Sequence, residues 1–244
     1  MNNRKHITLL GDSIFDNDKY VRKDCEVSKI LSWILEENNI SAENTLSALD
    51  GACIENVYVQ NVPLETTDIF LSISGNDLLR YYYEIFNYEY KEIKNPNYVP
   101  NLHKKIKFKI GNKLDQYYNF SEKYLYKLKT KTLKSEEEIA ILVKKMCIEV
   151  NDKYDKLLSY LTLLGIRVVV CDIYFAWMKD EKERELIKKV IKEVNKIIKA
   201  NCEKYNVEFL EISSILKEEK DFSHEIEPSE VGGFKLAKLI KDRI

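Results

Sequence analysis

The chain has 244 residues, 45% of them hydrophobic and 32% charged, and its formal net charge is −1. This length and composition fit one large α/β domain with a substantial core, and the near-neutral charge argues against a protein that binds nucleic acid over its whole surface. No stretch approaches the roughly 20 apolar residues of a membrane span, and the apolar run behind Arg4 and Lys5 is too short for a signal peptide. We therefore expect a cytoplasmic protein whose five cysteines, which show no paired spacing, are reduced thiols.

Short apolar stretches alternate with longer amphipathic ones along the chain. The expected strands cover residues 7–10, 45–49, 68–72, 166–171 and 207–210, and the expected helices cover residues 25–37, 54–59, 136–164, 180–205 and 232–244. Runs of β-branched apolar residues indicate buried strands, whereas apolar residues spaced by three and four indicate helices. This alternation predicts a parallel sheet of about five strands with helices on both faces, in a single domain over residues 1–244.

Residues 80–134 interrupt this alternation with an aromatic and basic segment. Ten of the 16 tyrosines lie here, and 13 basic residues against five acidic ones give the segment a charge near +8. We interpret it as a helical insertion after the third strand, at the sheet edge that binds ligands. Three interpretations of this segment are open. Its lysines form a solvated face, or the segment is a lid over the site, or it is a surface for an anionic partner such as a phospholipid headgroup or RNA. An exposed aromatic segment of this kind could also form a dimer contact.

Three polar loops follow the first three expected strands, and in a parallel sheet they meet at one edge. They are Asp12-Ser13, Asp50-Gly51-Ala52 and Ser74-Gly75-Asn76-Asp77. A serine hydroxyl, a glycine N–H and an asparagine amide converging there would make a nucleophile with oxyanion donors. Each loop also has a simpler explanation, because Asp, Ser and Asn cap helices and glycines occupy turns.

The Gly-Asp-Ser-Ile string at residues 11–14, the glycine after the second strand and the Gly-Asn-Asp string at residues 75–77 resemble the GDSL-type (SGNH) hydrolases. These are esterases and lipases with a flavodoxin-like three-layer α/β/α fold, and the resemblance covers about residues 5–77 and 165–244. The site residues that it implies are the nucleophile Ser13, the oxyanion donors Ser13, Gly51 and Asn76, and Asp12, which would hold the turn. It implies no metal and no organic cofactor.

The last block of the family pattern departs in this chain. The family expects Asp-x-x-His followed by Pro, and residues 221–229 read Asp-Phe-Ser-His-Glu-Ile-Glu-Pro-Ser. Matching Asp-x-x-His directly makes His224 the base and Asp221 its orienter. Matching the downstream Pro-Ser-x-x-Gly instead puts Glu227 at the position of the catalytic histidine, as in a subgroup of GDSL-like proteins. Because histidine titrates near neutrality and glutamate near 4.3, we expect His224 to be the base, with Glu227 as the alternative base or orienter.

These residues favour a serine hydrolase that cleaves an ester or thioester of a small carboxylic acid. Ser13 would attack the carbonyl carbon, His224 would take up and return the proton, and Asp221 would orient His224. The alternative is a catalytically inactive protein of the same fold that binds a small or anionic ligand at the sheet edge. Glu227 at the histidine position is the feature that favours this alternative.

Overall fold

The computed structural model describes residues 4–86, 90–94, 124–128, 133–178, 180–223 and 225–244. Five strands form a parallel sheet in the order β2-β1-β3-β6-β7. The strands are β1 (Lys5–Gly11), β2 (Ala42–Leu46), β3 (Asp68–Ser72), β6 (Arg167–Cys171) and β7 (Glu208–Leu210). The α-helices are α1 (Val27–Glu37), α2 (Gly75–Ile85), α4 (Glu136–Thr162), α5 (Glu181–Tyr205) and α6 (Glu230–Lys241). The short 3-10 helices are η1 (Ile54–Val59), η3 (Ile212–Ser214) and η4 (Glu219–Asp221).

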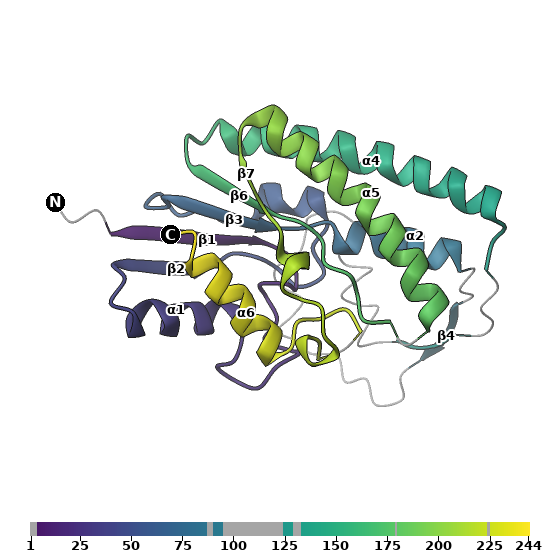
Figure 1. Ribbon diagram of the computed structural model, residues 1–244, viewed down its shortest axis with the longest axis horizontal. Helices are drawn as coiled ribbons and strands as arrows, with labels where there is room; N and C mark the ends of the chain where they lie inside the picture. Colours follow the sequence, from purple (N-terminus) through teal and green to yellow (C-terminus); the bar gives the residue numbers. More distant parts are fainter. Residues whose placement is uncertain (1–3, 87–89, 95–123, 129–132, 179, 224) are drawn as a thin grey trace.

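Helices cover both faces of the sheet and give the molecule three layers (Figure 1). The helices α1 and α6 lie below the sheet in that view, α4 and α5 lie above it, and α2 lies beyond the right-hand ends of the strands, in contact with α4. Strand residues alternate between the two layers because successive side chains of a strand point to opposite faces. In β3, Phe70 packs toward α1 and α6, while its neighbours Ile69 and Leu71 pack toward α4 and α5. The predicted α/β fold with a five-stranded parallel sheet is therefore confirmed.

Side-chain caps fix the starts of the helices that border the C-terminal half of the site. Asp180 accepts a hydrogen bond from the backbone N–H of Glu183 at the start of α5, at 2.9 Å. Ser229 accepts one from the N–H of Gly232 at the start of α6, at 3.2 Å. Such caps satisfy backbone donors that have no partner within the helix. The cap at Ser229 explains why α6 begins two residues before the predicted helix.

The second strand of the chain is Ala42–Leu46, whereas the sequence predicted a strand at residues 45–49. The strand is set by its pairing with β1, which ends where Leu9 faces Leu46. Beyond this point the N–H groups of Ser47 and Ala48 both donate to the carbonyl of Leu9, so the ladder stops. The apolar residues that suggested a later strand belong to the loop at the sheet edge.

The basic segment differs from the predicted helical insertion in the parts that the structure describes. Its first residues complete α2, and two further pieces form an antiparallel pair of strands, β4 (Tyr90–Lys94) and β5 (Tyr124–Leu128). Tyrosine favours strands, and both strands include two or more positions with an aromatic or branched side chain. The other residues of the segment, from 87–89 through 95–123 to 129–132, lie outside the described residues.

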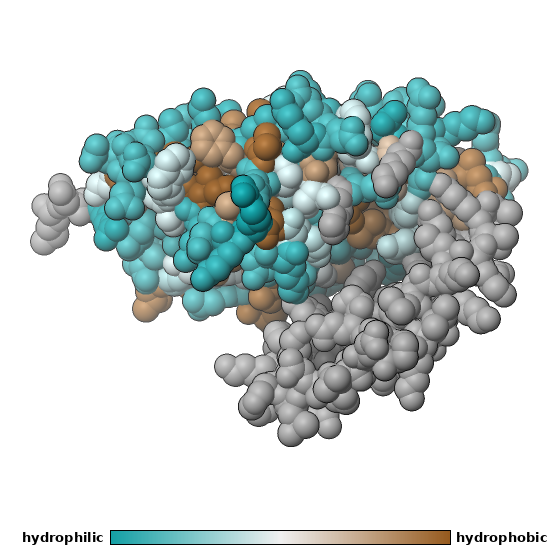
Figure 2. Space-filling model, turned by 90° about the horizontal axis from the view of Figure 1, so that it is seen from below, coloured by the Kyte–Doolittle hydropathy of each residue, from teal (hydrophilic) through white to brown (hydrophobic). Residues whose placement is uncertain are grey.

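The side of the molecule formed by α1 and α6 is mainly hydrophilic, with separate hydrophobic spots (Figure 2). Its exposed apolar side chains include Trp33 of α1 and Phe234 of α6, whose rings lie 6.4 Å apart. None of the described helices is both long enough and apolar enough to cross a bilayer.

Candidate active site

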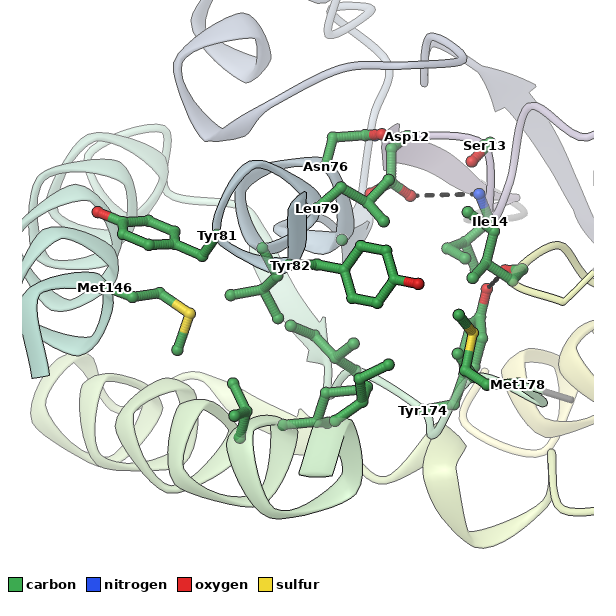
Figure 3. Close-up of a pocket in the computed structure, with 18 of the residues that line it drawn as sticks. Asp12, Ser13, Ile14, Asn76, Leu79, Tyr81, Tyr82, Met146, Tyr174 and Met178 are labelled. Atoms are coloured by element: carbon green, nitrogen blue, oxygen red, sulfur yellow. Dashed lines mark hydrogen bonds between the residues drawn. The ribbon is translucent and has the colours of Figure 1, made fainter. Parts of the chain in front are cut away.

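Ser13 lies in a tight turn directly after β1. The turn closes with hydrogen bonds from the N–H groups of Phe15 and Asp16 to the carbonyl of Asp12, at 3.2 and 3.1 Å. The Asp12 carboxyl adds a third, because its Oδ1 accepts from the N–H of Ile14 at 3.2 Å (Figure 3). An aspartate that bonds the backbone two residues ahead is a common way to build such a turn. Both Asp12 and Ser13 are buried, so the turn holds the serine hydroxyl at a fixed place at the sheet edge.

Gly11 allows β1 to approach β3 closely enough to set the position of this turn. Its φ is +129°, and a Cβ there would lie 1.7 Å from the carbonyl oxygen of Ser72. The buried side chain of Gln60 completes the hydrogen bonds of Gly11. Gln60 Oε1 accepts from the Gly11 N–H at 2.8 Å, and Gln60 Nε2 donates to the Gly11 carbonyl at 2.6 Å. Only glycine fits this position, since any side chain would collide with the neighbouring strand.

Asn76 lies in the first turn of α2, which begins next to Asp12. A Cβ added at Gly75 would lie 3.6 Å from Asp12 Oδ2, so the start of the helix packs against that carboxyl. The residue before the helix, Ser74, has a φ of +101°, a left-handed conformation that is strained for a serine. The hydroxyl of Tyr154 in α4 supports this bend by donating to the carbonyl of Ile73 at 3.0 Å.

A hydrogen bond from Asn76 holds the loop that contains Gly51, although Gly51 itself does not line the pocket described below. Asn76 Nδ2 donates to the carbonyl of Ala52 at 2.9 Å, which brings the loop beside the start of α2. Gly51 has a φ of +79°. The role of Gly51 as an oxyanion donor stays a prediction. The hydrogen bond between Asn76 and Ala52 is consistent with it, because this bond brings the two segments together.

Among the described candidate residues of the C-terminal block, Glu227 lines the pocket and Asp221 does not. Glu227 is buried, and it lies on a loop in which Ser223 N–H donates to the Glu227 carbonyl at 3.0 Å. Two side chains from elsewhere hold this loop. Asn17 Nδ2 donates to the Pro228 carbonyl at 3.3 Å, and the hydroxyl of Tyr174 donates to the Ile226 carbonyl. The loop is therefore held both by the segment after Ser13 and by the segment after β6.

Asp221 lies beneath this loop and is fully buried, but it does not line the pocket. Its Oδ2 accepts from the N–H groups of Lys217 and Glu218 at 2.9 and 3.0 Å and from Lys235 Nζ at 2.9 Å. Burial alone would raise the pKa of Asp221, but the bonds to Lys235 and to the backbone outweigh it, so this pKa is lowered. His224 lies outside the described residues, so the predicted Asp221–His224 pair stays a prediction.

Asp12, Ser13, Asn76 and Glu227 border one pocket at the carboxyl edge of the sheet (Figure 3). Its polar lining residues are Asp12, Ser13, Ser72, Asn76, Asp172 and Glu227, together with Tyr81, Tyr82 and Tyr174. The rest of its wall is formed mainly by apolar side chains of α2, α5 and the segment between β6 and α5. Ser13 and Asn76 lie toward one end with Asp12, and Tyr81 and Met146 lie at the opposite end (Figure 3). Such a pocket, apolar with a few convergent polar groups, is typical of a small-molecule site.

The electrostatic environment of the polar end is acidic. Burial raises the pKa of Asp12 well above its ordinary value of 3.8, and the charges of Glu227 and Asp77 raise it further, although the hydrogen bond from the Ile14 N–H opposes this. Burial is also the largest reason that the pKa of Tyr174 is raised, with Glu227 next. Strongly perturbed groups gathered in a cleft are typical of functional sites. No cluster of three His, Cys, Asp or Glu side chains suitable for a metal occurs within the described part of the chain.

Two positioning residues, Gln60 and Asn17, were missed by the reasoning from sequence. Gln60 reaches Gly11 across 49 positions and Asn17 reaches Pro228 across 211 positions, so no local motif connects either pair. Asn17 follows the last residue of the Gly-Asp-Ser-Ile string by three positions, and this proximity was a signal that could have identified it. Gln60 gave no comparable signal, because a lone polar residue after a short helix is ordinary.

The fold is that of several lipases and esterases of known structure. An extracellular lipase from Streptomyces rimosus aligns with a TM-score of 0.61 at 12% identity, covering 98% of this chain and 100% of the lipase. A phospholipase A1 from Streptomyces albidoflavus gives 0.59 at 13% identity, covering 99% and 100%. A member of the lipolytic protein G-D-S-L family from Veillonella parvula gives 0.53 at 16% identity, covering 98% and 97%.

Comparisons of sequence alone give no such likeness. No protein-family model matches the chain, and no curated protein matches it. The similarity therefore lies in the arrangement of helices and strands, at identities that show a shared fold. The chain has the three-layer α/β/α fold of the GDSL-type hydrolases, as its sequence motifs led us to expect.

Proposed function

We propose that the chain is a serine hydrolase that cleaves a carboxylic ester or thioester through an acyl-Ser13 intermediate. The observation that supports this most directly is the convergence of Ser13, Asn76 and Glu227 on one pocket from three distant parts of the chain. The pocket opens at the carboxyl ends of parallel strands, where ligands bind in open α/β sheets. The proteins of similar fold named above are lipases and a phospholipase, which agrees with this proposal.

In the proposed reaction, Ser13 Oγ attacks the carbonyl carbon of the substrate and gives its proton to a base. The new C–O bond pushes an electron pair onto the carbonyl oxygen, and this oxyanion accepts hydrogen bonds from Asn76 Nδ2 and from the N–H groups of Ser13 and Gly51. The oxyanion then collapses and expels the alcohol or thiol, which takes the proton from the base. Water repeats the same steps on the acyl-enzyme and releases the carboxylic acid.

The base is His224 in this proposal, and Glu227 orients it from inside the pocket. A buried carboxylate beside an imidazole would stabilise the imidazolium that forms when Ser13 loses its proton. What supports this role for Glu227 is that it lines the pocket with Ser13, whereas Asp221 already bonds two backbone N–H groups and Lys235. Asp221 then acts as a positioning residue that holds the loop on which His224 and Glu227 lie.

Labelling by a fluorophosphonate probe, with hydrolysis of p-nitrophenyl acetate measured in parallel, tests this assignment. We expect both signals to be lost in Ser13→Ala and His224→Ala, and kcat to fall strongly in Glu227→Gln. Retained labelling in His224→Ala with loss in Glu227→Gln would instead make Glu227 the base. Ser214→Ala, which changes an exposed serine, serves as the matched control and should label like the parent.

A second candidate is a binding protein of the same fold that has no turnover. The observation in its favour is that a carboxylate, Glu227, lies in the pocket at the position where the family pattern expects a histidine. A folded parent protein that neither labels nor hydrolyses p-nitrophenyl acetate would support this candidate and exclude the hydrolase.

A further inference from the structure

We infer that the acyl group of the substrate is a hydrocarbon chain of medium length, which lies between α2 and α5. This inference rests on the proposed hydrolase function and names its substrate class. It departs from the small carboxylic acid that the sequence suggested, because the pocket continues well beyond the groups that would perform the chemistry.

The walls of the pocket away from Ser13 are apolar on both sides. From α2 and the residue after it they include Leu78, Leu79, Ile85 and Phe86, and from α5 they include Leu186, Ile187, Val190 and Ile191. Tyr81 and Tyr82 of α2 also line this part, but their hydroxyls are bonded to carboxylates of other helices. Tyr81 donates to Glu149 of α4, and Tyr82 donates to Glu183 of α5. The rings therefore face the pocket while their polar atoms are engaged elsewhere.

The polar lining residues apart from these tyrosines come from the strand ends and the loops at the sheet edge. This distribution suits a substrate with one polar group, the ester carbonyl, at the end near Ser13 and Asn76. A sugar or peptide would leave hydroxyl or amide groups against the apolar walls, where an unpaired polar group costs free energy. A hydrocarbon chain has no such groups and gains from leaving water.

The length of the pocket sets the length of the chain that it can hold. On the side of α2 the wall runs from Asn76 to Phe86, the residue after the helix. Ten residues correspond to about 15 Å of helix, which an extended chain of about twelve carbons would span. Met146 of α4 is fully buried and lies at the end opposite Ser13 (Figure 3). The pocket therefore ends against the core.

An end of this kind also indicates which half of the ester occupies the pocket. The alcohol or thiol leaves before water attacks, so it needs a route to solvent while the acyl group is still bonded to Ser13. The acyl group must stay in place through both steps. A pocket that begins at Ser13 and ends at the core suits the part that stays.

The test compares p-nitrophenyl acetate with p-nitrophenyl octanoate, and measures binding separately in Ser13→Ala with the neutral ligands acetamide and octanamide. Burial of one methylene strengthens binding by up to about fourfold. We therefore expect kcat/KM to be at least about tenfold higher for the octanoate ester than for the acetate ester, and octanamide to bind at least about tenfold more tightly than acetamide. Leu79→Trp, which adds bulk to the α2 wall of the pocket, should remove most of both ratios. Leu64→Trp makes the same change at a fully exposed leucine and should leave both ratios unchanged.

The outcomes separate this inference from the proposed function. Turnover of acetate with equal rates on octanoate, and equal binding of the two amides, would overturn the acyl pocket and leave the hydrolase intact. Absence of all turnover, with tight octanamide binding that Leu79→Trp removes, would keep the hydrocarbon pocket and refute the hydrolase. Faster cleavage of octyl acetate than of ethyl octanoate would place the chain on the alcohol side and overturn the acyl assignment.

Discussion

Replacing Asp221 by asparagine separates a structural role of this residue from a catalytic one. The Asp221 carboxylate is fully buried and bonds two backbone N–H groups and Lys235. An asparagine oxygen can still accept from the backbone, but it loses the ion pair with Lys235, whose side chain is about one-third exposed. Hydrogen bonds to charged groups contribute about 1.5–3 kcal/mol, and partial exposure weakens this pair, so we expect the free energy of unfolding to fall by about 2 kcal/mol.

Urea unfolding and ester hydrolysis, measured on the same preparations, check this prediction. We expect a lower unfolding midpoint for Asp221→Asn and a fall in kcat of less than about tenfold, whereas the same change in a Ser-His-Asp triad costs about 10⁴-fold. Because the folded pKa of Asp221 is lowered, its stabilisation is present above the ordinary value of 3.8 and is lost as the pH falls through the folded value. Asp152→Asn, at an exposed position of α4, is the matched control. A thousandfold loss of kcat with an unchanged midpoint would refute the structural role.

Three further predictions concern the turn that holds Ser13. Gly11→Ala should lower the free energy of unfolding by more than about 3 kcal/mol, because the new Cβ would overlap the Ser72 carbonyl. Gly165→Ala, where φ is +67° but the space is open, should lower it by only about 1–2 kcal/mol. Equal urea midpoints for the two variants would contradict this. Gln60→Leu leaves the N–H of Gly11 without its side-chain acceptor, while the Gly11 carbonyl keeps the hydrogen bond from the Leu49 N–H at 3.0 Å. The change should cost about 1–3 kcal/mol and slow ester hydrolysis, and a thermal midpoint like that of the parent would show that the Gln60 bonds are unimportant. Asp12→Asn should stabilise the fold at about pH 7. Because the pKa of Asp12 is raised in the folded state, the parent loses stability as the pH rises above 3.8 toward the folded pKa, and an asparagine, which does not ionise, avoids this loss. This gain should vanish below pH 3.8, and a gain that does not depend on pH would exclude the titration of Asp12 as its cause.

Most of the sheet could be predicted because its central strands are short, apolar and buried on both faces. The strand β3 has the predicted bounds, and β6 differs from its prediction by one residue. The edge strand β2 could not be placed in this way, because Ala42–Leu46 is partly exposed and reads as an ordinary polar stretch. Its position is set by hydrogen bonds to β1, which a local pattern does not contain.

The site was predictable where strand ends determine it and unpredictable where distant residues do. Ser13 and Asn76 were expected at one sheet edge because each follows a parallel strand, and the structure brings them to one pocket. The apolar part of the pocket was not anticipated, because Leu79 and Tyr82 look like the residues of any amphipathic helix. The register of the last block stays a prediction, because Glu227 lines the pocket and Asp221 is buried outside it, while His224 lies outside the described residues.

The hydrogen bond from Asn17 to Pro228 links the turn after β1 to the loop before α6. During synthesis on the ribosome, the first strands and the serine emerge long before the residues that follow Phe222. A nascent chain would thus display the Ser13 hydroxyl while the C-terminal wall of the pocket is still unmade. In the proposed hydrolase, chemical competence is then delayed until α6 has docked, so partly made chains would not hydrolyse the esters around them.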